Sequence, residues 1–406
     1  MSYALQATTP AGKKFQAAAV AICADLRARA GSADKEGLVC ADNFRDLATN
    51  GIAAAFVPEA CGGWGLESVH DWIAGLSALG RGDGSTAIAI NMHLSISRGM
   101  AAAYGAAESA GKDTTGIARP LKAIAGGKML VCATATERGT DNLHPLTEAV
   151  ASEDGWVING TKMFVTLSPL ATHLGMNLRM RDAEGDHLVT TLLPMNTPGI
   201  IPQDDWDSLG MRASGSQSIK FENVAVPRSA LRRLGPWGEW STAVIINRTV
   251  GNLTLVAAFL GIAEHAREIA LNYVQGAKRL GQPIVSNAGV QHLVGEMEIE
   301  LAKCQAILSR AATGVDEFLA SHARNPASNE TAHELLKDYQ SAKWVVNRGA
   351  IDIVSKAMDL CGGAGFGNGT PLARLYRDVR AGPFMQPFAA TELREYVGKV
   401  TLGITR

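Results

Sequence analysis

A change in hydrophobic period divides the chain into three regions. Apolar residues recur at helical spacing in residues 10–125, as in KKFQAAAVAICADLRARA, and in three longer patterns within residues 240–406. Between these regions, residues 126–235 hold short β-branched runs separated by Gly, Asp and Pro. Because helical and strand patterns do not substitute for one another, the chain must place a β domain between two helical regions.

The predicted fold is mainly α-helical with a central β domain. We place an N-terminal helical domain at 1–125, an antiparallel β domain at 126–238 and a C-terminal helical bundle at 239–406. The chain has 406 residues, which is long for one simple domain. STAIAINMHLSISRGMAAAYGAAES is apolar on nearly all sides and predicts a buried helix. No helix interrupts the β region, which argues against a dinucleotide-binding βαβ unit.

Composition excludes several classes of protein. The net charge is -1 and no basic stripe occurs, so neither nucleic acid nor a membrane surface is an expected partner. We find no 18-residue apolar run and no apolar signal region. Six scattered cysteines, none in a CxxC pair, predict reduced thiols in a cytoplasmic protein and no metal site.

Six segments resemble the acyl-CoA dehydrogenase superfamily in order and spacing. They are FVPEACGG, CATATERGTDNL, DGWVINGTKMFVT, DSLGMRASGSQSIKFENVAVP, GQPIVSNAGVQHLVGEM and LCGGAGFGNGTPLARLYRDVR. The resemblance covers nearly the whole chain. It implies an N-terminal helical domain, a β-barrel domain and a C-terminal four-helix bundle. It also implies a homotetramer, with a flavin ring lying between the β domain and the bundle.

The resemblance assigns four residues to the flavin ring. Thr134 and Thr136 fall on positions that touch its pyrimidine end, where donors would stabilise the charge of reduced flavin. Thr166 falls where a hydroxyl approaches flavin N5. Phe164 replaces the usual Trp that shields the ring, and its aromatic face serves the same packing. The alternative is that TKMFVT is only a strand.

Three further residues match positions that hold the adenosine or pyrophosphate part of FAD. Gly362 and Gly363 would let the backbone approach adenosine, or they simply end a helix. The Arg that reaches the pyrophosphate across a subunit interface is replaced by Ala277, and Arg279 is its nearest substitute. We therefore expect a weakened grip on the dinucleotide.

The carboxylate that removes the substrate α-proton in dehydrogenases is missing. Its usual position falls on Gln386, and an amide cannot act as that base. A second family position for the base falls on Gly251. Gln386 thus marks either a different reaction or the loss of one.

The carboxyl end and the QDDWDSLGMR segment resemble flavin monooxygenases of this fold, the dibenzothiophene monooxygenase group. That resemblance implies reduced flavin, FMN or FAD, supplied by a separate flavin reductase. It implies a C4a-hydroperoxide that passes oxygen to sulfur, nitrogen or an aromatic carbon of a small molecule. A loosely held flavin fits such an exchange.

Four polar residues are candidates for this chemistry. His93 falls near an active-site His of those relatives, although a lone His on an apolar helix is more often structural. Asn91 is a weaker polar neighbour. Ser168 follows the flavin strand and could orient the substrate. Arg248 could pair with an anionic substrate or face solvent.

Two other functions stay open. The first is an acyl-CoA dehydrogenase whose base has moved, with Glu137, Glu392 and Glu395 as candidates. The second is a non-catalytic partner subunit. A flavin that is bleached by an acyl-CoA would favour the former, and a protein that is unreactive with any flavin would favour the latter.

Overall fold

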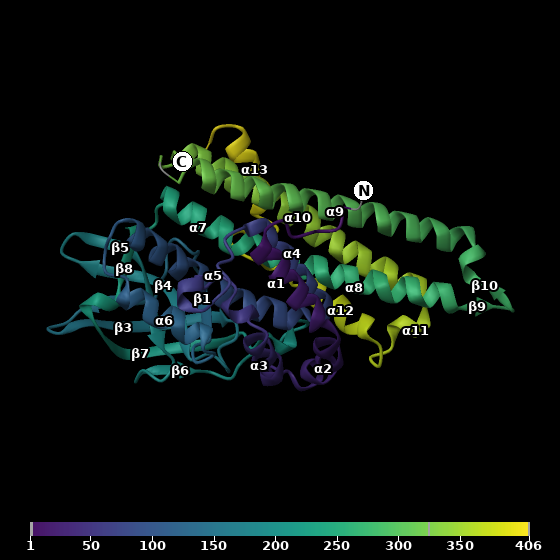
Figure 1. Cartoon of the computed structure of the whole chain (residues 1–406), viewed down its shortest axis with the longest axis horizontal. Coiled ribbons are helices and arrows are strands. Elements are labelled where there is room, and N and C mark those ends of the chain that lie inside the picture. The colour runs from purple at the N-terminus through teal and green to yellow at the C-terminus, as the bar shows by residue number, and fades with distance from the viewer. Residues whose placement is uncertain (1–2, 324, 405–406) are drawn as a thin grey trace.

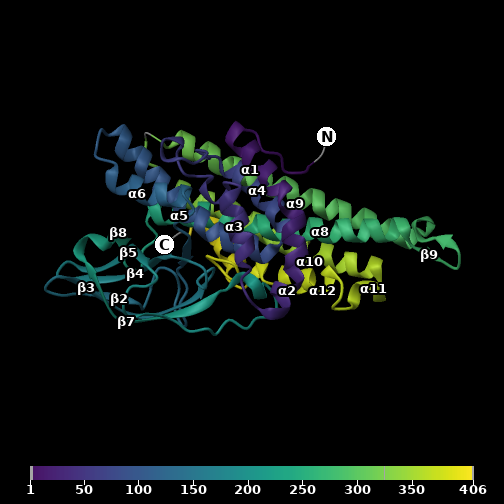
Figure 2. The same cartoon turned by 60° about the horizontal axis from the view of Figure 1, so that its bottom comes forward.

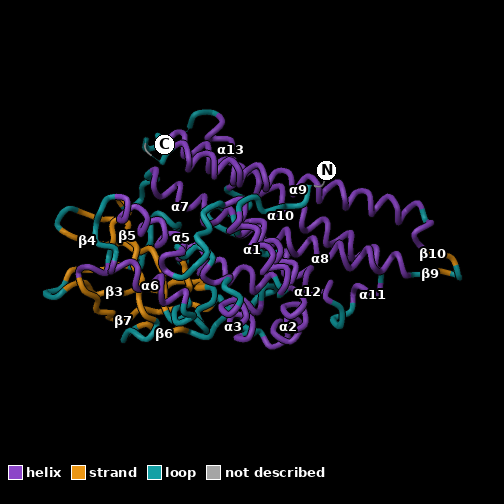
Figure 3. The backbone as a smooth tube through the Cα atoms, in the orientation of Figure 1, coloured by secondary structure: helices purple, strands orange, loops and turns teal. Residues whose placement is uncertain are grey.

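The computed structural model describes residues 3–323 and 325–404 and shows helices, then a sheet, then a helical bundle (Figure 1). The predicted fold class is confirmed. The sheet lies at one end of the elongated molecule, and the long helices run away from it toward the other end (Figures 1 and 3).

Helices α1 and α2 pack against α4, which in turn packs against α5, and α5 contacts β1 of the sheet. The first half of α5 is buried as predicted, but most residues after Ser97 are partly or fully exposed. Two 3-10 turns, η1 (Ile52–Ala54) and η2 (Glu59–Cys61), form the expected loop. The helices are α1 (Pro10–Ala21), α2 (Cys23–Glu36), α3 (Ala41–Thr49), α4 (Val69–Gly82), α5 (Gly84–Ser109) and α6 (Thr115–Ala125).

The central sheet is mixed. Its strand order is β6-β7-β3-β2-β4-β5-β8, with β1 also paired to β4. Both β1 and β2 run parallel to β4, so the prediction of a purely antiparallel domain was wrong for these two pairs. Hydrophobic alternation shows which face of a strand is buried but carries no information on strand direction. The strands are β1 (Val131–Thr134), β2 (Glu148–Ala151), β3 (Gly155–Val165), β4 (His173–Asp182), β5 (Gly185–Pro194), β6 (Ile200–Pro202), β7 (Gln217–Pro227) and β8 (Arg232–Pro236).

The C-terminal bundle contains three long helices, and the first of them follows a break at Thr254. A hairpin of β9 (Lys278–Arg279) and β10 (Gln282–Pro283) lies at the end far from the sheet (Figures 1 and 2). The helices are α7 (Thr242–Leu253), α8 (Leu255–Gly276), α9 (Ala288–Ser321), α10 (Asn329–Cys361), α11 (Gly363–Phe366), α12 (Pro371–Val379) and α13 (Leu393–Thr401), with 3-10 turns η3 (Arg212–Ser214), η4 (Arg228–Ala230), η5 (Ile284–Ser286) and η6 (Gly382–Phe384).

One helical stretch, Thr242–Gly276, is long and apolar enough by composition to cross a membrane. However, 72% of its 18-residue window is buried inside the protein. Its apolar residues are therefore explained by packing against α4 and α10, as in the core helix of a bundle.

Buried charges hold the three regions together at what we term the three-domain junction, formed by Asp83, Met211, Arg374 and Asp378. Arg374 Nη1 lies 3.2 Å from Asp83 Oδ1 and 3.4 Å from Asp378 Oδ2. The Met211 N–H, from the β domain, donates to Asp378 Oδ1 at 2.6 Å. The junction therefore fixes the position of the β domain between α5 and α12.

Candidate functional site

The loop after β1 lies against the end of β3. Thr134 Oγ1 donates to the Met163 carbonyl at 2.7 Å, and the Met163 N–H donates to the Thr136 carbonyl at 2.9 Å. An isolated bridge joins Ala133 to Thr166. The structure thus brings Thr134, Thr136 and Thr166 together, as the resemblance implied for one end of a flavin ring.

A chain of buried hydroxyls lies behind Thr166. Thr166 Oγ1 is 2.8 Å from Ser216 Oγ, which is 2.7 Å from Ser214 Oγ. If each serine donates toward the strand, Thr166 accepts one hydrogen bond, and its own proton makes only a long contact with the Phe164 carbonyl at 3.5 Å that a ligand could replace. We did not identify Ser214 and Ser216 from the sequence, although the alternating serines of ASGSQS were a visible signal.

Phe164 lies at the edge of the same surface. Its backbone has a positive φ of 51° and its side chain is half-exposed. The Trp206 ring meets it at 86° with ring centroids 5.9 Å apart. A half-exposed aromatic pair beside buried hydroxyls is suited to packing against a flat ring. Trp206 was another residue that we had not identified.

Gln386 belongs to a polar group that we call the Gln386 cluster, composed of the partly buried Thr136 and Gln386 and the buried Asn142 and Arg248. The Gln386 amide lies 2.9 Å from Thr136 Oγ1 and also contacts the Asn142 amide. Asn142 satisfies its neighbours when its nitrogen faces the Ala135 carbonyl and its oxygen faces Arg248 Nη1, both at 3.2 Å. The Gln386 nitrogen then faces Asn142, and the Gln386 oxygen accepts from Thr136.

Arg248 is the only cation in this cluster, and its charge is incompletely compensated. Its side chain is buried, and Nη2 donates to the Asn142 carbonyl at 2.7 Å. Its Nε has no partner among the described residues. Burial lowers the pKa of Arg248 to about 10, against the attraction of Asp141. A buried cation with spare donor capacity creates a positive potential suited to an anion. Asn142 and Asp141 were not predicted from the sequence.

His93 is placed differently from the prediction. It is fully buried, with Nε2 2.9 Å from the Ala53 carbonyl, and Nδ1 accepts from the Val131 N–H at 3.1 Å. Both ring nitrogens are therefore occupied by backbone groups. Burial lowers the pKa of His93 to about 4, so the ring is neutral at pH 7. The geometry favours the structural alternative over proton transfer.

Ser168 and Asn91 are both buried. Ser168 Oγ donates to the Gly215 carbonyl at 3.3 Å, which favours a role in holding that turn. Asn91 is fully buried, and neither its side-chain oxygen nor its nitrogen has a partner in the part of the chain that is described. Asn91 thus keeps unused hydrogen-bonding capacity on α5.

The second family position for a base holds Gly251, which carries no side chain. A Cβ at Gly251 would lie 2.9 Å from Ser95 Oγ of α5. A carboxylate side chain at this position would therefore force the Ser95 hydroxyl to move. Glycine at this position leaves α7 without the carboxylate of the family base.

The three candidates for a relocated base are also occupied or exposed. Glu137 forms a buried ion pair with Lys162 and accepts from the Leu146 and Thr147 N–H groups. Glu395 pairs with Lys399 on the surface at 2.6 Å, and Glu392 is exposed beside Ala389. None of them is presented to the surface formed by Thr136 and Thr166 in the way a base requires.

Arg279, Gly362 and Gly363 lie at the opposite end of the molecule from the flavin residues. Arg279 is exposed in the β9–β10 hairpin, Gly362 lies between α10 and α11, and Gly363 is the first residue of α11 (Figures 1 and 2). Gly362 has φ 56° and donates its N–H to the Met358 carbonyl, which is the geometry of a helix cap. Within one chain these residues cannot complete the site formed by Thr136 and Thr166, so that role stays a prediction for an assembled oligomer.

The residues present fit a flavin. Hydroxyls from Thr136 and Thr166, an aromatic pair and the cation of Arg248 converge where the β domain meets the bundle. The unpartnered Nε of Arg248 is an additional donor toward an anionic group.

Three protein-family domains match successive parts of this chain. The acyl-CoA dehydrogenase N-terminal, middle and C-terminal domains match residues 9–119, 131–224 and 244–386. The L-evernosamine nitrososynthase of a Micromonospora species is 32% identical over 98% of this chain and 92% of its own length. The amino sugar nitrososynthase DnmZ of Streptomyces peucetius is 31% identical over 97% of this chain and 94% of its own length.

Solved structures of related proteins are also similar to this chain. KijD3, in complex with FMN and dTDP-3-amino-2,3,6-trideoxy-4-keto-3-methyl-D-glucose, has a TM-score of 0.89 and 31% identity, covering 100% of this chain and 97% of its own. FMN-bound TdsC from Paenibacillus sp. A11-2, at 24% identity and a TM-score of 0.83 over 96% of this chain and 97% of its own, shares the fold. The presence of FMN in these relatives supports the expected flavin. The chain is a member of the acyl-CoA dehydrogenase family.

Proposed function

We propose that this protein is a flavin-dependent monooxygenase that oxidises the amine of a nucleotide-linked amino sugar. The observation that carries the proposal is the Gln386 cluster, in which an amide replaces the dehydrogenase base beside a buried, incompletely paired Arg248. Similarity to amino sugar nitrososynthases over nearly the whole chain indicates the substrate class. Reduced flavin, when bound, supplies two electrons for the activation of O2.

The first oxidation balances as amine, O2 and reduced flavin giving hydroxylamine, water and oxidised flavin. One oxygen atom forms the N–O bond, and the other leaves as water with the two flavin electrons. Thr136 and Gln386 would hold the cofactor, and Arg248 would stabilise negative charge on the flavin or the substrate. The chain of hydroxyls from Ser214 through Ser216 to Thr166 would orient the Thr166 hydroxyl as a hydrogen-bond donor. The chain itself would not take up a proton.

The accompanying parts of the proposal follow from the same chemistry. A cytoplasmic homotetramer would bring Arg279 of one chain toward the flavin site of another. A separate flavin reductase would supply the reduced cofactor, FMN or FAD, as the resemblance to flavin monooxygenases of this fold implies. Measurements of oligomeric state and of turnover with a reductase test these assignments.

The decisive experiment supplies reduced FMN anaerobically and then adds ¹⁸O2 with a dTDP-linked 3-amino sugar. We expect a product heavier by one labelled oxygen, with the other label in water. If no oxygenated product forms while bound FAD is bleached by an acyl-CoA, the dehydrogenase alternative is correct. If the chain binds no flavin in either redox state, the non-catalytic subunit becomes the better description.

A further inference from the structure

One face of α10 carries three hydrogen-bond donors at four-residue spacing: Tyr339, Lys343 and Asn347. Each is almost fully buried, and all three side chains point at the loop formed by residues 382–388. Residues four apart on a helix lie on one face, so the three form a row along α10. This loop carries Gln386.

The three side chains donate to four backbone carbonyls of the loop. Tyr339 Oη donates to the Gln386 carbonyl at 2.5 Å, and Asn347 Nδ2 donates to the Gly382 carbonyl at 2.8 Å. Lys343 Nζ donates to the Met385 carbonyl and, at 2.5 Å, to the Phe388 carbonyl. The carbonyls of Gln386 and its neighbours are therefore held by side chains of α10.

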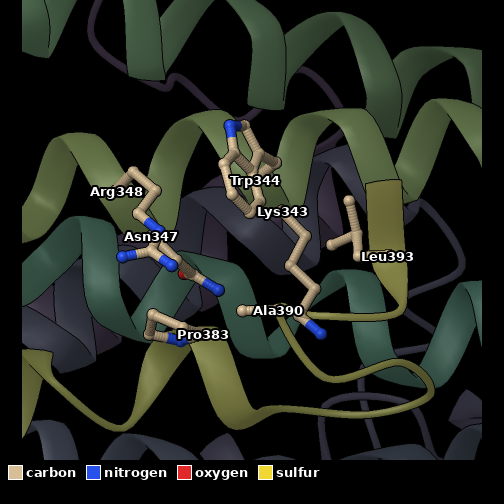
Figure 4. A pocket seen from close by; sticks show the side chains of 7 residues that line it. All are labelled: Lys343, Trp344, Asn347, Arg348, Pro383, Ala390 and Leu393. Carbon is tan, nitrogen blue, oxygen red and sulfur yellow. The ribbon is translucent and has the colours of Figure 1, made fainter. Parts of the chain in front are cut away.

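Lys343 occupies a costly position for a lysine. Figure 4 shows its side chain reaching from α10 toward the loop between Pro383 and Ala390. Burial lowers the pKa of Lys343 to about 7, against the attraction of Glu392. An amine donates to two carbonyls in either protonation state, so the contact persists across neutral pH. The fold thus accepts the desolvation of an amine in order to hold this loop.

The packing between helix and loop is also close. A Cβ at Gly382 would lie 2.8 Å from Asn347 Cγ, so only glycine allows this approach without a shift. Gln386, which belongs to this loop, directs its side chain at Thr136 and Asn142 of the Gln386 cluster.

We propose that Tyr339, Lys343 and Asn347 form a clamp that positions Gln386 against Thr136 in the flavin site. These are positioning residues, because they act through the Gln386 backbone and do not themselves contact Thr136. The inference rests on the proposed function for its catalytic meaning. The clamp itself can be measured in the chain without flavin.

The test combines hydrogen exchange with a double-mutant cycle on flavin affinity. The variants are Lys343→Met, Gln386→Ala and the pair, with Lys337→Met as the control. Lys337 lies on the same helix but pairs with Glu334 near the surface. We expect Lys343→Met to speed amide exchange in residues 382–388 and to weaken FMN binding about fivefold. In the Gln386→Ala background the same change should alter FMN affinity less than about twofold, since the effect passes through Gln386.

Three outcomes decide the matter. Unchanged loop exchange and unchanged FMN affinity in a folded Lys343→Met variant would overturn the clamp while leaving the proposed function intact. Equal losses of affinity with and without Gln386 would show a merely structural role and also overturn it. A wild-type chain that binds no flavin overturns the proposed function and the clamp's role in it together. If Lys343→Met does not fold, Tyr339→Phe removes one donor at nearly constant volume and takes its place in the cycle.

Discussion

The three-domain junction and the Gln386 cluster both bury charge, but they compensate it differently. At the junction, Arg374 lies between two carboxylates, and Asp378 also accepts the Met211 N–H. In the Gln386 cluster, Arg248 meets only amide and carbonyl oxygens, and its Nε is left without a partner among the described residues. In the junction the Arg374 cation is paired with carboxylates. In the cluster the Nε–H of Arg248 is a donor without an acceptor in the described part of the chain.

This difference separates a structural use of buried charge from a functional one. Removing one member of a paired group leaves the others desolvated, so the cost appears in stability. Removing a buried cation that lacks a counter-ion relieves a desolvation cost, so the loss should appear in ligand binding. The predictions below test this separation, from the largest expected effect to the smallest.

Asp378→Ala should give the largest loss of stability. It leaves the Met211 N–H without its acceptor and Arg374 with Asp83 alone. We expect the free energy of unfolding to fall by about 4 kcal/mol, measured by urea denaturation near pH 5, below the folded pKa of Asp378. Asp378→Asn, which keeps an acceptor oxygen, should lower the free energy of unfolding by less. A loss below about 1 kcal/mol for Asp378→Ala would show that the junction does not hold the domains together.

Arg248→Gln should behave in the opposite way. Because the cation has no carboxylate partner, we expect its removal to leave the free energy of unfolding unchanged or slightly higher. Affinity for reduced FMN or the nucleotide sugar should fall about 30-fold, equivalent to about 2 kcal/mol, by calorimetric titration. Arg228→Gln, at an exposed arginine that meets only backbone carbonyls, is the matched control. If Arg248→Gln lowers stability but not binding, Arg248 has a structural role like that of the junction residues, and the proposed difference between the two sites is wrong.

The junction should also respond to pH. Burial raises the pKa of Asp378 to about 6, above its value of about 3.9 in an unfolded chain. A raised folded pKa means that the contribution is fully present below about pH 4 and is lost as pH rises through 6. Relative to Asp378→Asn, the wild type should therefore lose on the order of 2 kcal/mol between pH 4 and pH 7. Parallel stability curves for the two proteins would show that Asp378 does not titrate in this range.

Part of the candidate site could be predicted from the sequence because motifs carry it. Thr136 and Gln386 are far apart in the chain, yet each falls on a position that the family motifs mark. Asn142 lies in the same CATATERGTDNL segment as Thr136, but the motif does not say that its side chain links Arg248 to Gln386, so only the folded structure reveals that contact. The same holds for the strand direction of β1 and β2, which alternation does not encode.

His93 shows a second limit of sequence reasoning. Its partners are the Ala53 carbonyl and the Val131 N–H, which are backbone groups 40 and 38 residues away. Any residue type at position 53, and any except proline at position 131, could supply these groups. A structural histidine and a catalytic one therefore look alike in a single sequence, and only contacts distinguish them.

His93→Ala accordingly tests structure against catalysis. The change leaves the Ala53 carbonyl and the Val131 N–H without partners in a buried position. We expect the free energy of unfolding to fall by about 1–2 kcal/mol. The yield of oxygenated product per reduced flavin should stay within about twofold of the wild type. A large fall in yield with little loss of stability would restore His93 as a catalytic residue.

Thr136→Val should give the smallest effect and sharpens the comparison from within the Gln386 cluster. Valine keeps the shape of threonine but removes the hydroxyl that meets Gln386, while the backbone contact to Met163 persists. We expect FMN affinity to fall about fivefold, or about 1 kcal/mol, with an altered absorption spectrum of the bound flavin. Thr140→Val is the control, because Thr140 lies in the same loop but donates to the His144 carbonyl. If both variants weaken FMN binding equally, the loop rather than the Thr136 hydroxyl determines affinity. If only Thr136→Val does so, the cluster's spare hydrogen-bonding capacity is directed at the flavin.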